Sequence, residues 1–288
     1  LGMLFGLQRM RAALWLSILL NVTNVVLDVF FVLGLGLGVA GVAAATLIGE
    51  WLAALAGLTI LYRILPWRAV AWKASLWRKE PLKRLMSLSG NLIVRSFFVQ
   101  LPFFVFTMIG ASLGDLVLAA NAIVMQLFMA MAFVLDGPAH TAETLCGFAY
   151  GARNRAGLRD SARYSGFWAL GLAAALSLLL LAGGETFVAW LTLLPDVRAA
   201  AAPLLPWAVA APLVAVWAFH LDGVFIGTTQ TAVLRNCMFI AALVYLAVIW
   251  LSIDRLGNTS LWLAMMVFMG LRGILLGAWY PRIERQLL

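Results

Sequence analysis

The stretch of sequence that decides the fold runs from Leu116 to Gly147 and reads LVLAANAIVMQLFMAMAFVLDGPAHTAETLCG. A helix that crosses a membrane needs about 20 mostly apolar residues. This stretch is longer than that, and Asp136 and Glu143 are its only acidic or basic residues apart from one histidine. It therefore predicts a membrane-spanning helix with its carboxyl end projecting beyond the bilayer. Pro138 predicts a break or kink in that helix.

Apolar stretches of similar length lie on both sides of this one. The eight predicted spans are 12–33, 39–62, 88–110, 116–147, 164–183, 200–226, 237–253 and 260–280. We expect Pro102 to kink the third span, and Pro203, Pro206 and Pro212 to distort the start of the sixth.

The composition agrees with this reading. Apolar residues make up 64% of the 288 residues and charged residues 11%, and the mean hydropathy is +1.00. A soluble domain is about 45–50% apolar and about 25% charged, so these figures exclude a soluble enzyme, a disordered chain and a disulfide scaffold. The predicted fold class is an all-α, polytopic transmembrane helical bundle with about eight spans.

The basic residues predict an orientation. Every second connection between spans lies on the same side of the membrane. Sixteen of the 20 Lys and Arg residues fall in one such set of connections or at the adjoining span ends, whereas Arg198 and Arg255 fall in the other set. Basic loops stay on the cytoplasmic side of a membrane. We therefore expect a bacterial cytoplasmic (inner) membrane protein with a cytoplasmic C-terminus. The same rule accounts for the net charge of +8, so we expect no nucleic-acid partner.

The spans divide unevenly about a basic, Trp-bearing connection at residues 63–87. Such a segment is typical of a linker on the inner leaflet. Residues 1–62 and 88–288 would then be separate parts. The sequence FGLQ at residues 5–8 is weakly matched by FIG at residues 225–227 together with Gln230. This similarity indicates that the protein is built from two repeats. Repeats are common in secondary transporters, and this one predicts that about four spans precede Leu1.

A group of short motifs resembles a known family. The segment Asn24–Gly34 (NVVLDVFFVLG), followed by GVAG at 38–41 and AAAT at 43–46, is similar to helices five and six of the multidrug and toxic compound extrusion (MATE) transporters, and closest to their DinF-like branch. The further matches, in family order, are AANA at 119–122, LDG at 135–137, AET at 142–144, YGAR at 150–153, LDG at 221–223, FIG at 225–227 and LRG at 271–273.

The resemblance implies a twelve-helix, two-lobe transporter with alternating access, driven by an ion gradient. Residues 1–62 would be the end of the N-lobe, helices five and six; residues 63–87 the cytoplasmic linker; and residues 88–288 the C-lobe, helices seven to twelve. The chain would be N-terminally incomplete, without the first-helix aspartate that takes part in the family's N-lobe ion site.

Polar residues inside the first two spans are candidates for ion coupling. Ser17, Asn21, Asn24 and Asp28 are spaced four, three and four apart, so they share one helix face. Such residues can be interhelical hydrogen-bonding glue. A carboxylate buried in a membrane is instead a functional candidate, because burial favours its protonated form and allows proton exchange near physiological pH. The resemblance implies that Asn24, Asp28 and Thr46 form the N-lobe site.

A second set of candidates lies in the later spans. Asp136, His140 and Glu143 are spaced four and three apart and share a face. Asp136, Glu143 and Asp222 match acidic positions of the family, and are a possible C-lobe proton relay or substrate-binding set. The first two could instead cap a helix break at Pro138.

Other residues of these spans are predicted to have mainly structural roles, in ion pairs or in packing. Arg95 and Arg272 are the only basic residues deep inside spans, and one of them could form a structural ion pair with Asp222 or Asp136. His220 and Asp222 are two residues apart and should point to different sides of their helix. The stretch Met125, Phe128, Met129, Met131 and Phe133 is mostly packing, with a subset able to line an adaptable drug cavity.

These observations leave several functions open, of which a multidrug efflux antiporter, coupled to protons or to Na⁺, is favoured. A lipid-linked precursor flippase would need several cavity cations, whereas only Arg95 and Arg272 are available. An integral-membrane enzyme would need a convergent catalytic set, and neither His140 nor His220 lies in a familiar catalytic or metal motif. A channel would need a filter-like loop. We therefore expect no enzyme activity, no catalytic residues, no metal and no cofactor beyond the ion gradient. The expected partners are small amphiphilic or cationic substrates and membrane lipids, bound to a monomer.

Overall fold

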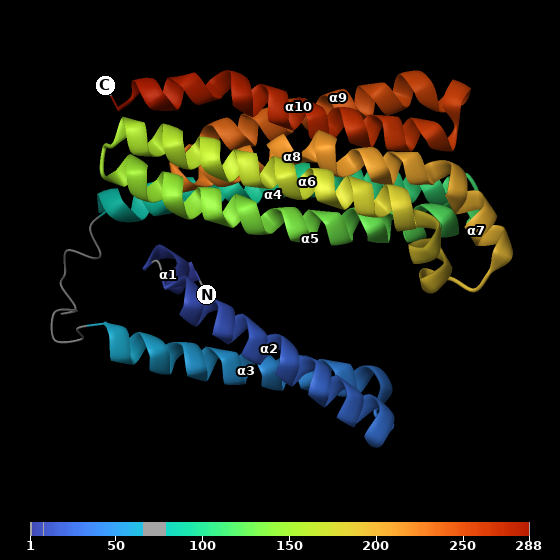
Figure 1. Cartoon of the computed structure of the whole chain (residues 1–288), viewed down its shortest axis with the longest axis horizontal. Helices are drawn as coiled ribbons and strands as arrows, with labels where there is room; N and C mark the ends of the chain where they lie inside the picture. Colours follow the sequence, from blue (N-terminus) through green and yellow to red (C-terminus); the bar gives the residue numbers. More distant parts are fainter. Residues whose placement is uncertain (1, 8, 66–78, 288) are drawn as a thin grey trace. The chain divides into compact units, whose positions relative to one another are not determined.

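A computed structural model of the chain describes residues 2–7, 9–65 and 79–287 (Figure 1). Residues 66–78, which include most of the predicted linker, lie outside the described residues. The chain divides into two compact units, Leu1–Arg78 and Lys79–Leu288. Each is described by itself.

The first unit is a helical hairpin. It contains α1 (Gly2–Gly6), α2 (Met10–Val29), a short π-helix η1 (Phe30–Gly34) and α3 (Gly38–Ile64). The chain reverses at Gly36 and Gly38, whose φ angles of +66° and +53° are readily adopted by glycine. The two helices pack against each other, and Gly49 of α3 lies beside the α2 backbone, where an added Cβ would come 3.6 Å from the carbonyl oxygen of Leu20.

The second unit is a bundle of long helices (Figure 1). Its elements are α4 (Lys79–Ser112), α5 (Asp115–Gly151), α6 (Arg155–Leu191), α7 (Pro195–Ala201), a 3₁₀ turn η3 (Ala202–Leu204), α8 (Leu205–Gly227), α9 (Thr231–Leu256) and α10 (Asn258–Arg285). α8 lies at the centre, packed against α5, α6 and α10, while α9 packs against α10 and α4.

The eight predicted spans are confirmed, with corrected ends. Eight helical segments of the described chain are long and apolar enough to cross a membrane. α4 begins at Lys79 and α6 at Arg155, both earlier than the apolar pattern predicts. The cause at α6 is visible. The side chain of Asn154 accepts a hydrogen bond from the backbone N–H of Gly157 at 2.9 Å, which caps a first turn too polar to be recognised by hydropathy.

The prolines act less uniformly than expected. The predicted distortion at the start of the sixth span is confirmed, because the 3₁₀ turn that contains Pro203 separates α7 from α8. The alternative of a break at Pro138 is wrong, because α5 continues as a helix through it from Asp115 to Gly151. Pro102 also lies within a continuous helix, α4, and its carbonyl accepts a hydrogen bond from the Tyr245 hydroxyl at 2.9 Å.

A pair of glycines sets the contact between α5 and α8. Gly223 and Gly227 form a GxxxG spacing on α8, a pattern that lets helix backbones approach closely in membranes. A Cβ added to Gly223 would overlap the carbonyl oxygen of Ala139, and one added to Gly227 would overlap that of Glu143. This approach places the acidic face of α5 beside Asp222.

Candidate functional site

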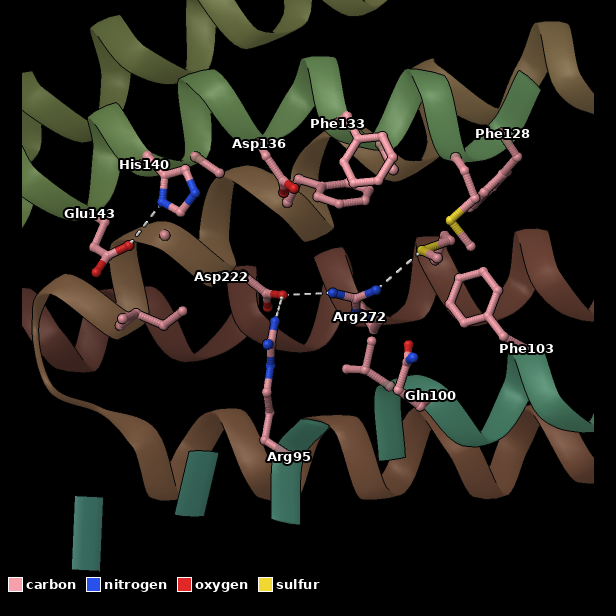
Figure 2. A pocket seen from close by; sticks show the side chains of 18 residues that line it. Arg95, Gln100, Phe103, Phe128, Phe133, Asp136, His140, Glu143, Asp222 and Arg272 are labelled. Carbon is pink, nitrogen blue, oxygen red and sulfur yellow. Dashed lines mark hydrogen bonds and ion pairs between the residues drawn. The ribbon is translucent and has the colours of Figure 1, made fainter. Parts of the chain in front are cut away.

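A cavity of about 330 Å³ lies inside the second unit, between α4, α5, α8 and α10 (Figure 2). Its lining residues are Arg95, Val99, Gln100, Phe103, Phe128, Met129, Ala132, Phe133, Asp136, Ala139, His140, Glu143, Phe219, Asp222, Gly223, Ile226, Met269 and Arg272. The three acidic residues predicted for this part of the chain therefore face one space. The prediction that part of the Met- and Phe-rich stretch lines a cavity is confirmed for Phe128, Met129 and Phe133.

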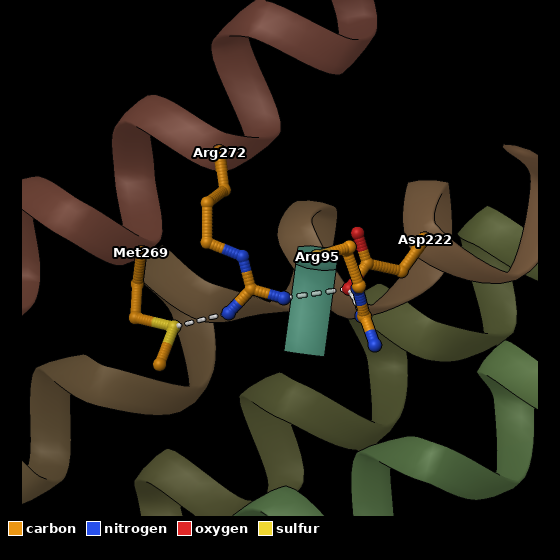
Figure 3. Close-up of polar contacts among 4 residues, drawn as sticks. All are labelled: Arg95, Asp222, Met269 and Arg272. Atoms are coloured by element: carbon orange, nitrogen blue, oxygen red, sulfur yellow. Dashed lines mark hydrogen bonds and ion pairs between the residues drawn. The ribbon is translucent and has the colours of Figure 1, made fainter. Parts of the chain in front are cut away.

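The most buried polar group of the cavity is an ion triad that joins three helices (Figure 3). Asp222 of α8 accepts hydrogen bonds at Oδ2 from Arg95 of α4 and from Nη2 of Arg272 of α10, the latter at 2.6 Å. Asp222 and Arg272 are 6% and 2% exposed. The sequence predicted that one arginine pairs with an acidic residue, whereas both pair with the same oxygen.

Arg272 has further contacts that hold its guanidinium in place. Nη1 donates to the sulfur of Met269 at 3.2 Å. The guanidinium carbon lies 5.3 Å from the ring centre of Phe268 and 5.9 Å from that of Phe219, within range of cation–π attraction. Two guanidinium groups and one carboxylate give the triad a charge of +1. The second carboxylate oxygen, Oδ1 of Asp222, is buried and has no hydrogen-bond partner among the described residues.

The acidic residues of α5 lie on the opposite wall. Asp136 is half-buried, whereas His140 and Glu143 are more open, with 61% and 38% of their side chains exposed. The His140 Nδ1 lies 3.3 Å from a carboxylate oxygen of Glu143. The three lining carboxylates exceed the two lining arginines by one charge, so the cavity is slightly negative when His140 is neutral. Within the described residues, no group of three His, Cys, Asp or Glu side chains could hold a metal ion.

His220 and Asp222 face different spaces, as their spacing predicts. His220 lines a separate hollow together with Arg159, Arg163 and Tyr280. His220 is therefore not part of the acidic cavity.

The predicted N-lobe residues lie in the first unit. The Asn24 amide donates to the Thr46 hydroxyl at 3.2 Å, and that hydroxyl donates to the Val42 carbonyl at 3.0 Å. The structure thus brings Asn24 and Thr46 together across the hairpin. Asp28 is one turn from Asn24; its Oδ1 is buried and has no hydrogen-bond partner among the described residues.

Some features of the site were missed by sequence reasoning. The shared use of Asp222 by Arg95 and Arg272 depends on helix packing and has no local signal. The GxxxG spacing of Gly223 and Gly227, by contrast, is legible in the sequence and could have predicted the α5–α8 contact.

Comparisons with known proteins agree with this fold. A family model described as MatE matches residues 92–251. The DNA damage-inducible protein F of Escherichia coli (strain K12) is 40% identical, over 98% of this chain and 61% of its own length. Protein DETOXIFICATION 44, chloroplastic, of Arabidopsis thaliana is 26% identical, over 96% of this chain and 52% of its own length.

A solved structure has a similar fold. A mutant of the MATE transporter VcmN from Vibrio cholerae matches with a TM-score of 0.84 at 18% identity, over 98% of this chain and 64% of that chain. The chain thus spans between about half and two thirds of the length of these proteins. Because the family model covers more than half of it, the chain belongs to the MatE family, and its resemblance to the MATE transporters is confirmed.

Proposed function

We propose that this chain is part of a secondary active antiporter that exports small amphiphilic or cationic compounds by alternating access, driven by a proton gradient. The observation that carries the proposal is the cavity of the second unit in a member of the MatE family. It lies between four membrane-length helices and combines apolar walls with a small number of charged groups.

The lining of the cavity suits an adaptable binding site for lipophilic cations. Phe103, Phe128, Phe133 and Phe219 supply flat apolar surface, and Met129 supplies a flexible, polarisable side chain. Small-molecule sites commonly combine such walls with a few polar groups that fix orientation.

The charges of the cavity fit a cation better than an anion. The triad of Asp222, Arg95 and Arg272 keeps one positive charge, whereas Asp136 and Glu143, which have no arginine salt bridge within the described residues, bring two negative charges to the opposite wall. A bound cation would be attracted to these two carboxylates. The same count disfavours a flippase for a lipid-linked pyrophosphate, because its cavity would need an excess of cations.

Proton coupling is proposed through the first unit. A carboxylate within a membrane is a proton-relay candidate by default, because its charged form is costly there. Asp28 has a buried carboxylate oxygen that makes no hydrogen bond to the described residues, and it lies one turn from the Asn24–Thr46 pair. Asp28, Asn24 and Thr46 are thus three polar residues of the α2–α3 hairpin, two of them joined by a hydrogen bond, in a mostly apolar part of the chain.

The orientation and assembly belong to the same proposal. The excess of basic residues on one side supports a protein of the bacterial cytoplasmic membrane with its C-terminus inside. We propose that it works as a monomer and without a metal or an organic cofactor.

Efflux from proteoliposomes tests the proposal. The native gene product is reconstituted, the vesicles are loaded with a fluorescent lipophilic cation, and a proton or Na⁺ gradient is imposed. We expect a proton gradient to accelerate efflux several-fold over vesicles without a gradient, and Na⁺ alone to have no effect. Equal efflux with and without the proton gradient would contradict the proposed coupling.

A further inference from the structure

The second unit has another hollow, separate from the acidic cavity, along the contact between α8 and α10. This groove of about 520 Å³ is walled by Trp217 and Leu221 of α8 and floored by three glycines of α10, Gly270, Gly273 and Gly277. A Cβ on Gly273 would lie 3.0 Å from the Cβ of Trp217, so the helices touch there. The lining of the groove is apolar except for the indole N–H of Trp217 and the hydroxyl of Tyr280.

The groove opens into a basic basin. A hollow of about 230 Å³ shares Trp217, Leu221 and Tyr280 with the groove, so the two spaces adjoin. The basin adds Arg159 and Arg163, which are one turn apart on α6. An apolar channel thus ends at two guanidinium groups.

Positive charge is in excess around the basin. Glu284 is the carboxylate that pairs with Arg159, at 2.5 Å, and it is shared with Arg155, at 3.5 Å. Arg163 is exposed and adds a further positive charge, and no carboxylate is among the residues that line the basin. The three arginines Arg155, Arg159 and Arg163 exceed the two nearby carboxylates, Glu284 and Asp160, by one charge, which favours an anion at this place.

A buried histidine lies at the floor of the basin. His220 is 3% exposed and lines the hollow, packed against Gly166 of α6. Its Nδ1 is buried and has no hydrogen-bond partner among the residues that the structure describes. The imidazole also hydrogen-bonds the backbone of Ala162, one helical turn before Gly166 on α6, so His220 is held in place as part of the floor of the basin.

We propose that the groove and the basin together bind one anionic phospholipid, with an acyl chain along the three glycines and the phosphate against Arg159 and Arg163. A phospholipid presents a phosphate next to an apolar chain, which is the order in which the two hollows occur. A free phosphate would leave the groove empty, and a zwitterionic lipid would leave the excess of positive charge uncompensated.

Native mass spectrometry of the purified gene product tests this proposal with two probes, phosphatidylglycerol and phosphatidylcholine, at equal concentration. We expect one phosphatidylglycerol to be retained in preference to phosphatidylcholine. Arg163→Gln should weaken that retention about five-fold, the effect of one basic residue at a membrane surface. Arg285→Gln, which removes the same charge from an exposed residue that does not line the basin, is the matched control and should retain the lipid.

A second variant tests the groove separately. A Cβ at Gly277 has only Leu221 nearby, at 3.8 Å, so Gly277→Leu should fold and fill the groove. It should reduce lipid retention, and soluble glycerol phosphate should not displace the lipid from the wild-type protein. The proposal is overturned if the wild type holds the two lipids equally or holds neither because another segment covers the groove. It is also overturned if Arg163→Gln and Arg285→Gln lose lipid to the same extent, or if glycerol phosphate alone competes.

Discussion

Replacing Asp222 with asparagine tests the ion triad. The substitution keeps the size of the side chain and removes its charge. In the structure one oxygen of Asp222 accepts hydrogen bonds from Arg95 and Arg272. Only 3% of the Arg272 side chain is exposed, so its guanidinium cannot reach water without movement of α10, whereas Arg95 is 19% exposed.

The expected loss of stability follows from how deeply Arg272 and Arg95 are buried. Removal of one partner of a buried ion pair costs about 3–5 kcal/mol, because an uncompensated charge stays buried. Arg95 can be partly hydrated from the cavity, so we expect the lower end of this range, about 3 kcal/mol. For a domain of 150–250 residues, each kcal/mol lowers the melting temperature by about 2–4 °C. Asp222→Asn should therefore lower it by about 6–12 °C.

Thermal unfolding of the purified protein in detergent, followed by tryptophan fluorescence, measures this change. Asp254→Asn is the matched control, because Asp254 is exposed at the end of α9, and surface substitutions usually change stability by less than about 0.5 kcal/mol. The double variant Asp222→Asn/Arg272→Met removes both the anion and the most buried cation. It should recover at least half of the loss, since a buried ion pair can be replaced by apolar side chains at little cost.

Either of two results would contradict the stabilising role of the triad. One is that Asp222→Asn melts within about 2 °C of the wild type, in which case the triad does not stabilise the bundle. The other is that Arg272→Met lowers the melting temperature by the same amount in the Asp222→Asn background as in the wild type. The two residues would then act independently.

Three further outcomes are expected. Gly223→Ala should destabilise the protein by about 1–3 kcal/mol through overlap with the α5 backbone, whereas Gly137→Ala, in open space on α5, should be neutral or stabilising in the same melt; equal effects would contradict the proposed α5–α8 contact. In intact cells an impermeant thiol reagent should label a cysteine placed at Leu193 but not one at Ala152, and the opposite pattern would reverse the orientation. Thr46→Ala removes the acceptor of the α2–α3 hydrogen bond, worth about 0.5–1.5 kcal/mol, and should shift the pH dependence of efflux rather than abolish transport; complete loss would give this residue a larger role than the structure assigns.

The spans were predictable because their signal is local. An apolar run of membrane length requires a helix, since no other element of that length satisfies its backbone hydrogen bonds in lipid. The helix ends were less predictable. The first five residues of α6 include Arg155 and Arg159 and follow the Asn154 cap, so hydropathy does not reveal where this helix begins. Pro138 did not break α5, because neighbouring packing can maintain a helix in a membrane bundle through a proline.

The candidate site was predictable in part. The spacing of Asp136, His140 and Glu143 fixes a common helix face, and all three line the cavity. The arrangement of Arg95 and Arg272 around Asp222 was not predictable, because it joins three helices that are far apart in sequence. Their pairing depends on how the helices pack, which composition and periodicity do not specify.

The proposed coupling depends most directly on Asp28. The decisive measurement is efflux from proteoliposomes under an imposed proton gradient, for the wild type and for Asp28→Asn. Asparagine keeps the shape of the side chain, and the buried oxygen of Asp28 makes no hydrogen bond to the described residues that the exchange would remove. We predict that Asp28→Asn binds the fluorescent cation as the wild type does but loses gradient-driven efflux, because the titratable proton is gone. Gradient-driven efflux at the wild-type rate would contradict the account, and Asp136, Glu143 and Asp222 would then be the carboxylates to test.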